Sequence, residues 1–220
     1  MKVGTDGVLL GAWAGTDTPK EILDIGTGTG LLAMMLAQRF PNARVTAIEP
    51  NSHAISDAEF NFENSPFAER LKLIRTNLQD YKTDRRFDLI ISNPPFFANS
   101  LVSGNSGRTE ARHTHSLGPE DLAEATALLS ENGKISVIYP TETYGAFKTA
   151  MAKFGFFEER RTEVKPNLEK ALHRVLGEFK KDAQLLEQGE LVIEKYGRHQ
   201  YSEEYIRLTQ DFYLFGENDN

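Results

Sequence analysis

The first 155 residues alternate between short apolar runs and longer stretches with helical periodicity, and this alternation constrains the fold more than any other feature of the chain. The apolar runs are nearly continuous and rich in β-branched residues, which is typical of strands that are buried on both faces of a sheet. Helices between consecutive strands provide the crossover that parallel strands need. The sequence therefore predicts an α/β fold with a doubly wound, mostly parallel sheet.

The expected strands of this sheet are residues 21–26, 44–49, 71–75, 87–92 and 133–139, and the expected helices are residues 31–40, 52–62, 120–130 and 142–154. An Asn132-Gly133 turn is expected to introduce the last strand. From residue 156 the pattern changes, because the strand-like runs 161–164, 174–179 and 190–194 are not separated by long helices. We therefore expect an antiparallel or mixed C-terminal edge. Four aromatic side chains are interpreted as core: Trp13, Phe154, Phe156 and Phe157.

The composition excludes several kinds of chemistry. The 220 residues contain no cysteine, which excludes disulfide scaffolds, thiolate zinc sites, iron–sulfur clusters and cysteine nucleophiles. His113, His115 and His173 lack the partner carboxylates of a metal site, so no metal is expected. Residues 1–18 hold only short apolar patches, which fits neither a signal peptide nor a spanning helix; we expect a cytoplasmic protein. The net charge of −7 means that nucleic-acid binding would need a local basic patch.

A glycine-rich string, Asp24-Ile25-Gly26-Thr27-Gly28-Thr29-Gly30, stands where the first strand passes into the first long helix. Glycine lets the backbone approach a ligand closely at such a turn. A tight turn without a ligand is the alternative. The spacing differs from the Gly-x-Gly-x-x-Gly of pyrophosphate-binding folds.

Two acidic residues refine the interpretation of this turn. Asp24 would repel a pyrophosphate but suits a ligand with a cationic amino-acid end, and Glu49 closes the next strand where an acid can hold ribose hydroxyls. Glu49 could also be an ordinary carboxylate at a strand end. Together these residues favour S-adenosylmethionine over NAD. The cofactor-binding candidates are Asp24, Gly26, Thr27, Gly28, Gly30 and Glu49, with Asn77 and Leu78 around the adenine, Asp80 as the second choice there, and Asn93.

The string Asn93-Pro94-Pro95-Phe96 directly follows the fourth strand. This place is the carboxyl edge of the sheet, where α/β folds bind their ligands. Two prolines stiffen the backbone and remove two donors, which leaves rigid carbonyl acceptors. The Asn93 side-chain oxygen and the Pro94 carbonyl could hold both hydrogens of a planar amino group while Phe96 stacks on its ring. A proline-stiffened strand exit is the alternative.

These two motifs resemble a class I methyltransferase that acts on amino nitrogens. Three further strings are similar to the bacterial tRNA1(Val) (adenine-37-N6)-methyltransferase family: residues 1–13 (MKVGTDGVLLGAW), residues 173–176 (HRVL), and the segment from residues 201–205 (YSEEY) to 212–215 (FYLF). Family members usually carry a short segment before the first string. Phe96 stands where tyrosine is commoner in the family, which keeps stacking and removes a hydroxyl.

The resemblance implies a single Rossmann-like methyltransferase domain over residues 1–220. Residues 1–18 would cover the cofactor, residues 19–155 would form the parallel core, and residues 156–220 would form the C-terminal edge and tail. It implies S-adenosylmethionine as the methyl donor, S-adenosylhomocysteine as its product, and the adenosine 3′ of the anticodon in a valine tRNA as substrate. The implied catalytic residues are Asn93, Pro94, Pro95 and Phe96.

An anticodon-loop base is single-stranded and can enter a pocket, so a small basic rim suffices for RNA contact. Arg108 and Arg112, in the polar stretch 99–117, and Arg174 are the candidates for tRNA contact, although that stretch could be only a solvated connection. We expect a monomer. Other functions remain open: methylation of a protein glutamine amide, an rRNA guanine or a DNA adenine, or a non-catalytic cofactor-binding subunit.

Overall fold

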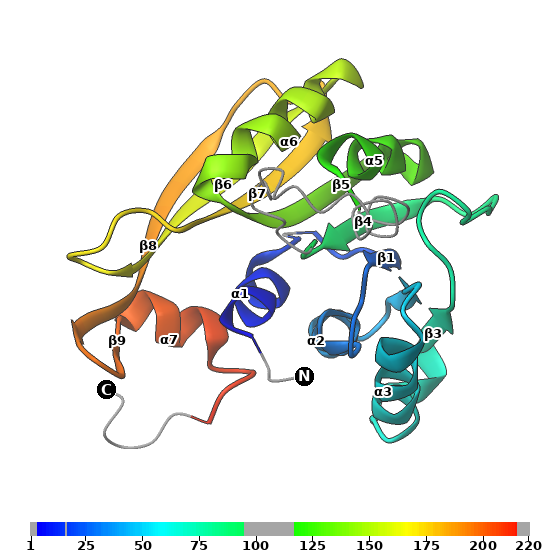
Figure 1. Ribbon diagram of the computed structural model, residues 1–220, viewed down its shortest axis with the longest axis horizontal. Helices are drawn as coiled ribbons and strands as arrows, with labels where there is room; N and C mark the ends of the chain where they lie inside the picture. The colour runs from blue at the N-terminus through cyan, green and yellow to red at the C-terminus, as the bar shows by residue number, and fades with distance from the viewer. Residues whose placement is uncertain (1–3, 16, 95–116, 215–220) are drawn as a thin grey trace, which may run out of the picture.

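The computed structural model describes residues 4–15, 17–94 and 117–214, and one mixed sheet organises them (Figure 1). The order of its nine strands is β3-β2-β1-β4-β5-β7-β6-β8-β9. The strands are β1 (Glu21–Ile25), β2 (Arg44–Ile48), β3 (Leu71–Ile74), β4 (Phe87–Ser92), β5 (Leu129–Pro140), β6 (Phe156–Asn167), β7 (Arg174–Lys181), β8 (Glu187–Gly197) and β9 (Gln200–Tyr201). The helices are α1 (Thr5–Trp13), α2 (Leu31–Arg39), α3 (Ser52–Glu63), α5 (Pro119–Glu124), α6 (Thr141–Lys153) and α7 (Glu203–Thr209), with 3-10 turns η1 (Ala68–Arg70) and η2 (Ala125–Leu128).

Strands β1 to β5 are all parallel to one another, as the alternating pattern predicts. Strand β7 then runs antiparallel to both β5 and β6, and β8 runs parallel to β6. The prediction of a doubly wound sheet with an antiparallel C-terminal edge is confirmed. Because β6 has the same direction as β5, the carboxyl ends of β1, β4, β5, β6 and β8 lie along one edge of the sheet.

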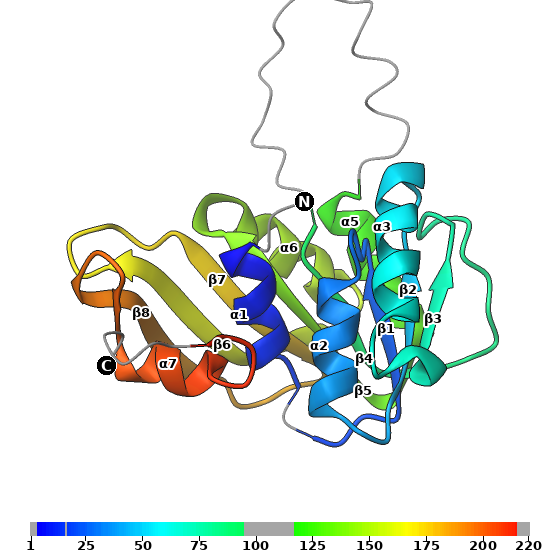
Figure 2. The ribbon, with the colours of Figure 1, turned by 90° about the horizontal axis from the view of Figure 1, so that it is seen from below.

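Two hydrophobic clusters cover the two faces of the sheet. In β1 and β4 consecutive residues alternate between them: Ile22 and Leu89 belong to the cluster under α1 and α2, while Leu23 and Ile90 belong to the cluster under α5 and α6. This alternation follows from the two-residue period of a strand. Figure 2, seen from below, shows α1, α2, α3 and α7 on one face, with α5 and α6 behind.

The structure corrects three details. Asn132 and Gly133 lie inside β5 and do not precede it, and the helix predicted over 120–130 is the shorter α5 followed by η2. Trp13 and Phe156 are buried as predicted, but Phe154 and Phe157 are 44% and 46% exposed. Within the described ranges, no helix combines the length and the apolar character needed to cross a membrane.

Candidate active site

The glycine turn between β1 and α2 is held in a conformation that only glycine adopts easily. Gly26, Gly28 and Gly30 have φ values of +74°, +59° and +85°, in the left-handed region that disfavours a Cβ. A Cβ added to Gly26 would meet no atom within 4 Å, whereas one added to Gly30 would overlap the ring of Phe62 on α3. Gly26 therefore faces open space that a ligand can fill, and Gly30 is required by packing.

Asp24 lies behind this turn and is completely buried. The Thr27 hydroxyl donates a 2.5 Å hydrogen bond to Asp24 Oδ2, while Asp24 Oδ1 is buried without a hydrogen-bond partner. Burial raises the pKa of Asp24 to about 7, against the lowering effect of the Thr27 hydrogen bond. A buried carboxyl oxygen without a partner is costly and is expected where a ligand completes the site.

Glu49 follows β2, and its carboxylate turns back toward the glycine turn. Glu49 Oε2 accepts a 3.0 Å hydrogen bond from the backbone N–H of Gly28, and Oε1 accepts one of 2.9 Å from the N–H of Asn51. Each carboxylate oxygen can accept a second hydrogen bond, so the side chain still has room for two hydroxyls. Asn51 itself caps α3 through hydrogen bonds from the N–H groups of His53 and Ala54. Sequence analysis did not single out Asn51, although an Asn directly before a helix is a capping signal.

The residues predicted around an adenine follow β3 at the same edge of the sheet. Asn77 and Asp80, which compete for that role, are bonded to each other: Asn77 Nδ2 donates to Asp80 Oδ2 at 2.9 Å, and the Asp80 N–H donates to Asn77 Oδ1 at 2.8 Å. Leu78 between them is half-buried and packs against the core. Leu78 is thus an apolar side chain within a turn that the hydrogen bonds between Asn77 and Asp80 hold in place.

Asn93 and Pro94 leave the end of β4 beside the glycine turn. The buried Ser92 hydroxyl donates a 2.8 Å hydrogen bond to the Ile25 carbonyl, which ties the end of β4 to the end of β1. Asn93 is half-buried and Pro94 is buried. Pro95, Phe96, Arg108 and Arg112, which sequence analysis assigned to catalysis and tRNA contact, lie outside the described residues.

The first turn of α1 lies over this site. A Cβ added to Gly7 would come within 3.3 Å of Leu31 Cδ2 and within 4.0 Å of Asn93 Nδ2. The neighbouring residue Asp6 accepts a 2.8 Å ion-paired hydrogen bond from Arg174 Nε at the start of β7. Arg174, the third predicted tRNA contact, therefore fastens α1 to the sheet edge.

Sequence reasoning missed the residue that holds the other end of α1. Arg39 Nη1 donates to the carbonyls of Gly11 and Ala14 at 2.8 and 2.6 Å, and Nη2 donates to the carbonyl of Gly15 at 3.3 Å. A cation at the carboxyl end of a helix also balances the helix dipole. No local sequence pattern could reveal these hydrogen bonds, since Arg39 follows Gly11 by 28 positions.

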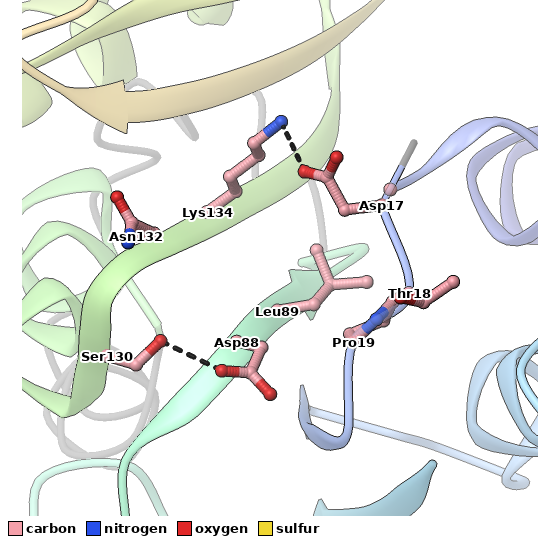
Figure 3. Close-up of a pocket in the computed structure, with 9 residues that line it drawn as sticks. Asp17, Thr18, Pro19, Asp88, Leu89, Ser130, Asn132 and Lys134 are labelled. Carbon is pink, nitrogen blue, oxygen red and sulfur yellow. Dashed lines mark hydrogen bonds and ion pairs between the residues drawn. The ribbon is translucent and has the colours of Figure 1, made fainter. Parts of the chain in front are cut away.

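A pocket of about 240 Å³ lies at the opposite, amino edge of the sheet, and its charged side chains are already bonded to neighbouring groups (Figure 3). Ser130 donates to Asp88, and Lys134 forms ion pairs with Asp17 at 2.9 Å and with Glu159 at 2.7 Å. This network is structural. In the described part of the chain, no group of three or more His, Asp or Glu side chains is placed to hold a metal ion.

The fold and the glycine turn define a methyltransferase, and comparisons with known proteins agree. The family model of the methyltransferase small domain matches residues 7–164 of this chain. A solved O-methyltransferase, itself assigned by prediction, from Agrobacterium tumefaciens shares the fold with a TM-score of 0.75 and 20% identity, over 97% of this chain and 100% of that one.

Relatives with higher sequence identity to this chain show to which methyltransferase family it belongs. The tRNA1(Val) (adenine(37)-N6)-methyltransferases of Trichodesmium erythraeum and Haemophilus influenzae are 42% and 43% identical to this chain, each over 97% of it, and the alignments cover 91% and 92% of those proteins. The chain belongs to the tRNA1(Val) (adenine(37)-N6)-methyltransferase family.

Proposed function

We propose that this protein transfers a methyl group from S-adenosylmethionine to N6 of adenosine 37, next to the anticodon, in tRNA1(Val). The observation that carries the proposal is the hydrogen bond between Ser92 and Ile25, because it joins the strand end before Asn93 and Pro94, the proposed acceptors, to the strand end before the glycine turn. The names of the relatives support the substrate. The glycine turn and the Asn93-Pro94 segment, which lie side by side, support an amino nitrogen as the methyl acceptor.

The described residues fit the proposed cofactor. Gly26 faces open space for its amino-acid part, with Thr27 and Gly28 next to it in the turn, and the buried carboxyl of Asp24 would balance the ammonium charge through the turn. Glu49 has acceptor positions left for the ribose hydroxyls. The Asn77-to-Asp80 turn with Leu78 forms the wall for the adenine.

When bound, S-adenosylmethionine supplies an electrophilic methyl group on sulfonium. The contribution of the chain is to position the attacking nitrogen. The side-chain oxygen of Asn93 and the carbonyl of Pro94 accept the two amino hydrogens, which draws the nitrogen toward tetrahedral geometry and frees its lone pair. The nitrogen would carry a positive charge after accepting the methyl group, and this methylated amine cation is acidic enough to release its proton to water, so the chain needs no strong general base. Phe96 is proposed to stack on the adenine, and Arg108 and Arg112 to contact the tRNA.

Incubation with labelled S-adenosylmethionine and tRNA that lacks the modification, followed by nucleoside mass spectrometry, tests the proposal. We expect N6-methyladenosine in tRNA1(Val) and none with Asn93→Ala, which should bind the cofactor as tightly as the wild type. Full activity of Asn93→Ala would refute the acceptor role. Transfer only to DNA, to rRNA or to a protein glutamine would refute the substrate, and cofactor binding without any transfer would indicate a non-catalytic subunit.

We also propose a cytoplasmic location, which a tRNA substrate supports. We expect the protein to act as a monomer. Size-exclusion chromatography with light scattering tests this expectation, and a stable dimer at the working concentration would contradict it.

A further inference from the structure

The C-terminal strings that carry the family resemblance have no role in the site described so far, yet the fold gathers them around one pocket. The ring centroids of Tyr201 and Tyr205 are 5.1 Å apart and nearly parallel, and those of Tyr205 and Tyr213 are 6.5 Å apart. The pocket has a volume of about 610 Å³. Its lining residues are Thr5, Pro166, Ile193, Glu194, His199, Tyr201, Tyr205, Tyr213 and Leu214.

The pocket is an extension of the active-site edge of the sheet. Pro166 and Glu194 belong to the carboxyl ends of β6 and β8, and these ends share their edge with the ends of β4 and β5. In Figure 1 the end of β8, β9 and α7 are grouped beside α1.

The first turn of α1 connects this pocket to Asn93 within three residues. Thr5 lines the pocket, Asp6 binds Arg174, and Gly7 faces the Asn93 amide. In helix geometry the Cα atoms of Thr5 and Gly7 are only about 5–6 Å apart. A polymer whose target base lies at Asn93 can therefore cross this turn and reach the pocket.

We propose that this pocket receives a second base of the RNA substrate, outside the target adenosine. This inference rests on the proposed function and adds a recognition site to it. Tyr201 and Tyr213 are half-buried, so they combine a fixed ring with an accessible part, as base-stacking side chains do. Glu194 and His199 on the lining supply hydrogen-bonding groups for a base edge.

The charges around the pocket suit a phosphate backbone. Lys170 in the β6–β7 connection and Arg198 at the β8–β9 turn are exposed and form no ion pair with any described residue. In contrast, the nearby Lys165 and Lys195 are paired with Glu190 and Glu203. Lys170 follows the lining residue Pro166 by four positions and Arg198 directly precedes the lining residue His199, so two exposed cations accompany the pocket in a chain whose net charge is −7. RNA is therefore favoured over an apolar peptide as the occupant.

The test compares the double variant Tyr201→Leu/Tyr213→Leu with Tyr201→Phe/Tyr213→Phe. Leucine keeps apolar volume for the core contact of the two residues, while phenylalanine keeps the ring. We expect the leucine variant to bind unmodified tRNA about 10-fold more weakly in fluorescence anisotropy, since stacking is worth about 1–3 kcal/mol per base. The phenylalanine variant should bind within about 3-fold of the wild type. Phe157→Leu, an exposed ring at the other end of β6, is the control and should not change binding.

Two further measurements separate this inference from the proposed function. The KM for S-adenosylmethionine should be unchanged in the leucine variant, and a trinucleotide that contains only the target adenosine and its neighbours should bind the variant and the wild type equally. Thermal melting shows whether the leucine variant is folded. If the folded variant binds tRNA as tightly as the wild type, the proposal that the pocket receives a base is wrong. A wild-type protein that binds tRNA through the pocket but transfers no methyl group overturns the proposed function and leaves the pocket standing.

Discussion

Asp24→Asn tests the burial of the carboxyl behind the glycine turn. Each tenfold change in proton affinity is worth about 1.4 kcal/mol. Raising the pKa from 3.8 to about 7 therefore costs the fold about 4 kcal/mol when the carboxyl is ionised in both states. Asparagine has the same shape, and its oxygen still accepts the Thr27 hydroxyl.

The sign of the pH dependence follows from proton binding. Below pH 3.8 the carboxyl is protonated in the folded and the unfolded chain, and its favourable contribution is fully present. Between about pH 4 and pH 7 the unfolded chain loses this proton while the folded chain keeps it, so stability falls as pH rises. Above pH 7 both states are ionised and the loss is complete.

Urea unfolding of the wild type and of Asp24→Asn at pH 5, 6, 7 and 8, without cofactor, measures this loss. The wild type should lose about 3 kcal/mol relative to the variant between pH 5 and 8. Asp88→Asn is the matched control: although burial opposes ionisation, hydrogen bonds from the N–H groups of Lys20 and Glu21 hold the pKa of Asp88 below its usual value. Its difference from the wild type should be constant in this range. Parallel pH profiles of Asp24→Asn and the wild type would show that Asp24 is ionised in the fold.

Three further predictions concern the turn, the ribose and the RNA. Gly30→Ala should destabilise the fold by about 2–4 kcal/mol in urea unfolding, because the new Cβ overlaps the Phe62 ring at a positive φ; an unchanged midpoint would contradict that packing. Glu49→Ala should weaken S-adenosylmethionine binding by about 10- to 100-fold in calorimetry, and unchanged affinity would remove Glu49 from the site. Joint replacement of Arg108 and Arg112 by Ala should weaken tRNA binding and flatten its dependence on salt, whereas an identical salt slope would exclude both from phosphate contact.

The parallel core was predictable because its central strands β1, β2 and β4 are mostly buried and therefore consist of nearly continuous apolar residues. Glycine, proline or polar residues separate these strands from the helices that follow them. The error at Asn132-Gly133 has a local cause. Phe87 pairs with Leu129 but Leu89 pairs with Lys134, so the residues between Leu129 and Lys134 form an irregularity in β5. A Cβ at Gly133 would come within 2.7 Å of the Phe87 carbonyl. Glycine is needed at this position because two strands approach each other closely there. The resulting Asn-Gly dipeptide is the same as the one that is typical of a turn.

The misplaced aromatic residues have a different explanation. Phe156 and Phe157 are consecutive in β6, so their side chains point to opposite faces, and only Phe156 is buried. Sequence analysis could not tell which face of β6 is covered at this end, since that depends on α6 and on the neighbouring strands. In contrast, the proximity of Gly26 and Glu49 could be predicted from the sequence. Both residues stand at the ends of strands, and the common direction of the parallel strands alone brings them together.

The segment 1–18 illustrates what sequence cannot supply. Its resemblance predicts a cover for the cofactor, yet every residue from Gly7 to Trp13 is buried, and Trp13 is fixed by a 3.0 Å hydrogen bond to Thr162 and by the guanidinium of Arg160, 3.8 Å from its ring centroid. These partners are about 150 positions away in the chain. Only the first turn of α1 reaches the site, and its Asp6 is held by Arg174. Helix α1 is therefore packed into the fold along most of its length, and contacts between residues far apart in the sequence determine this packing.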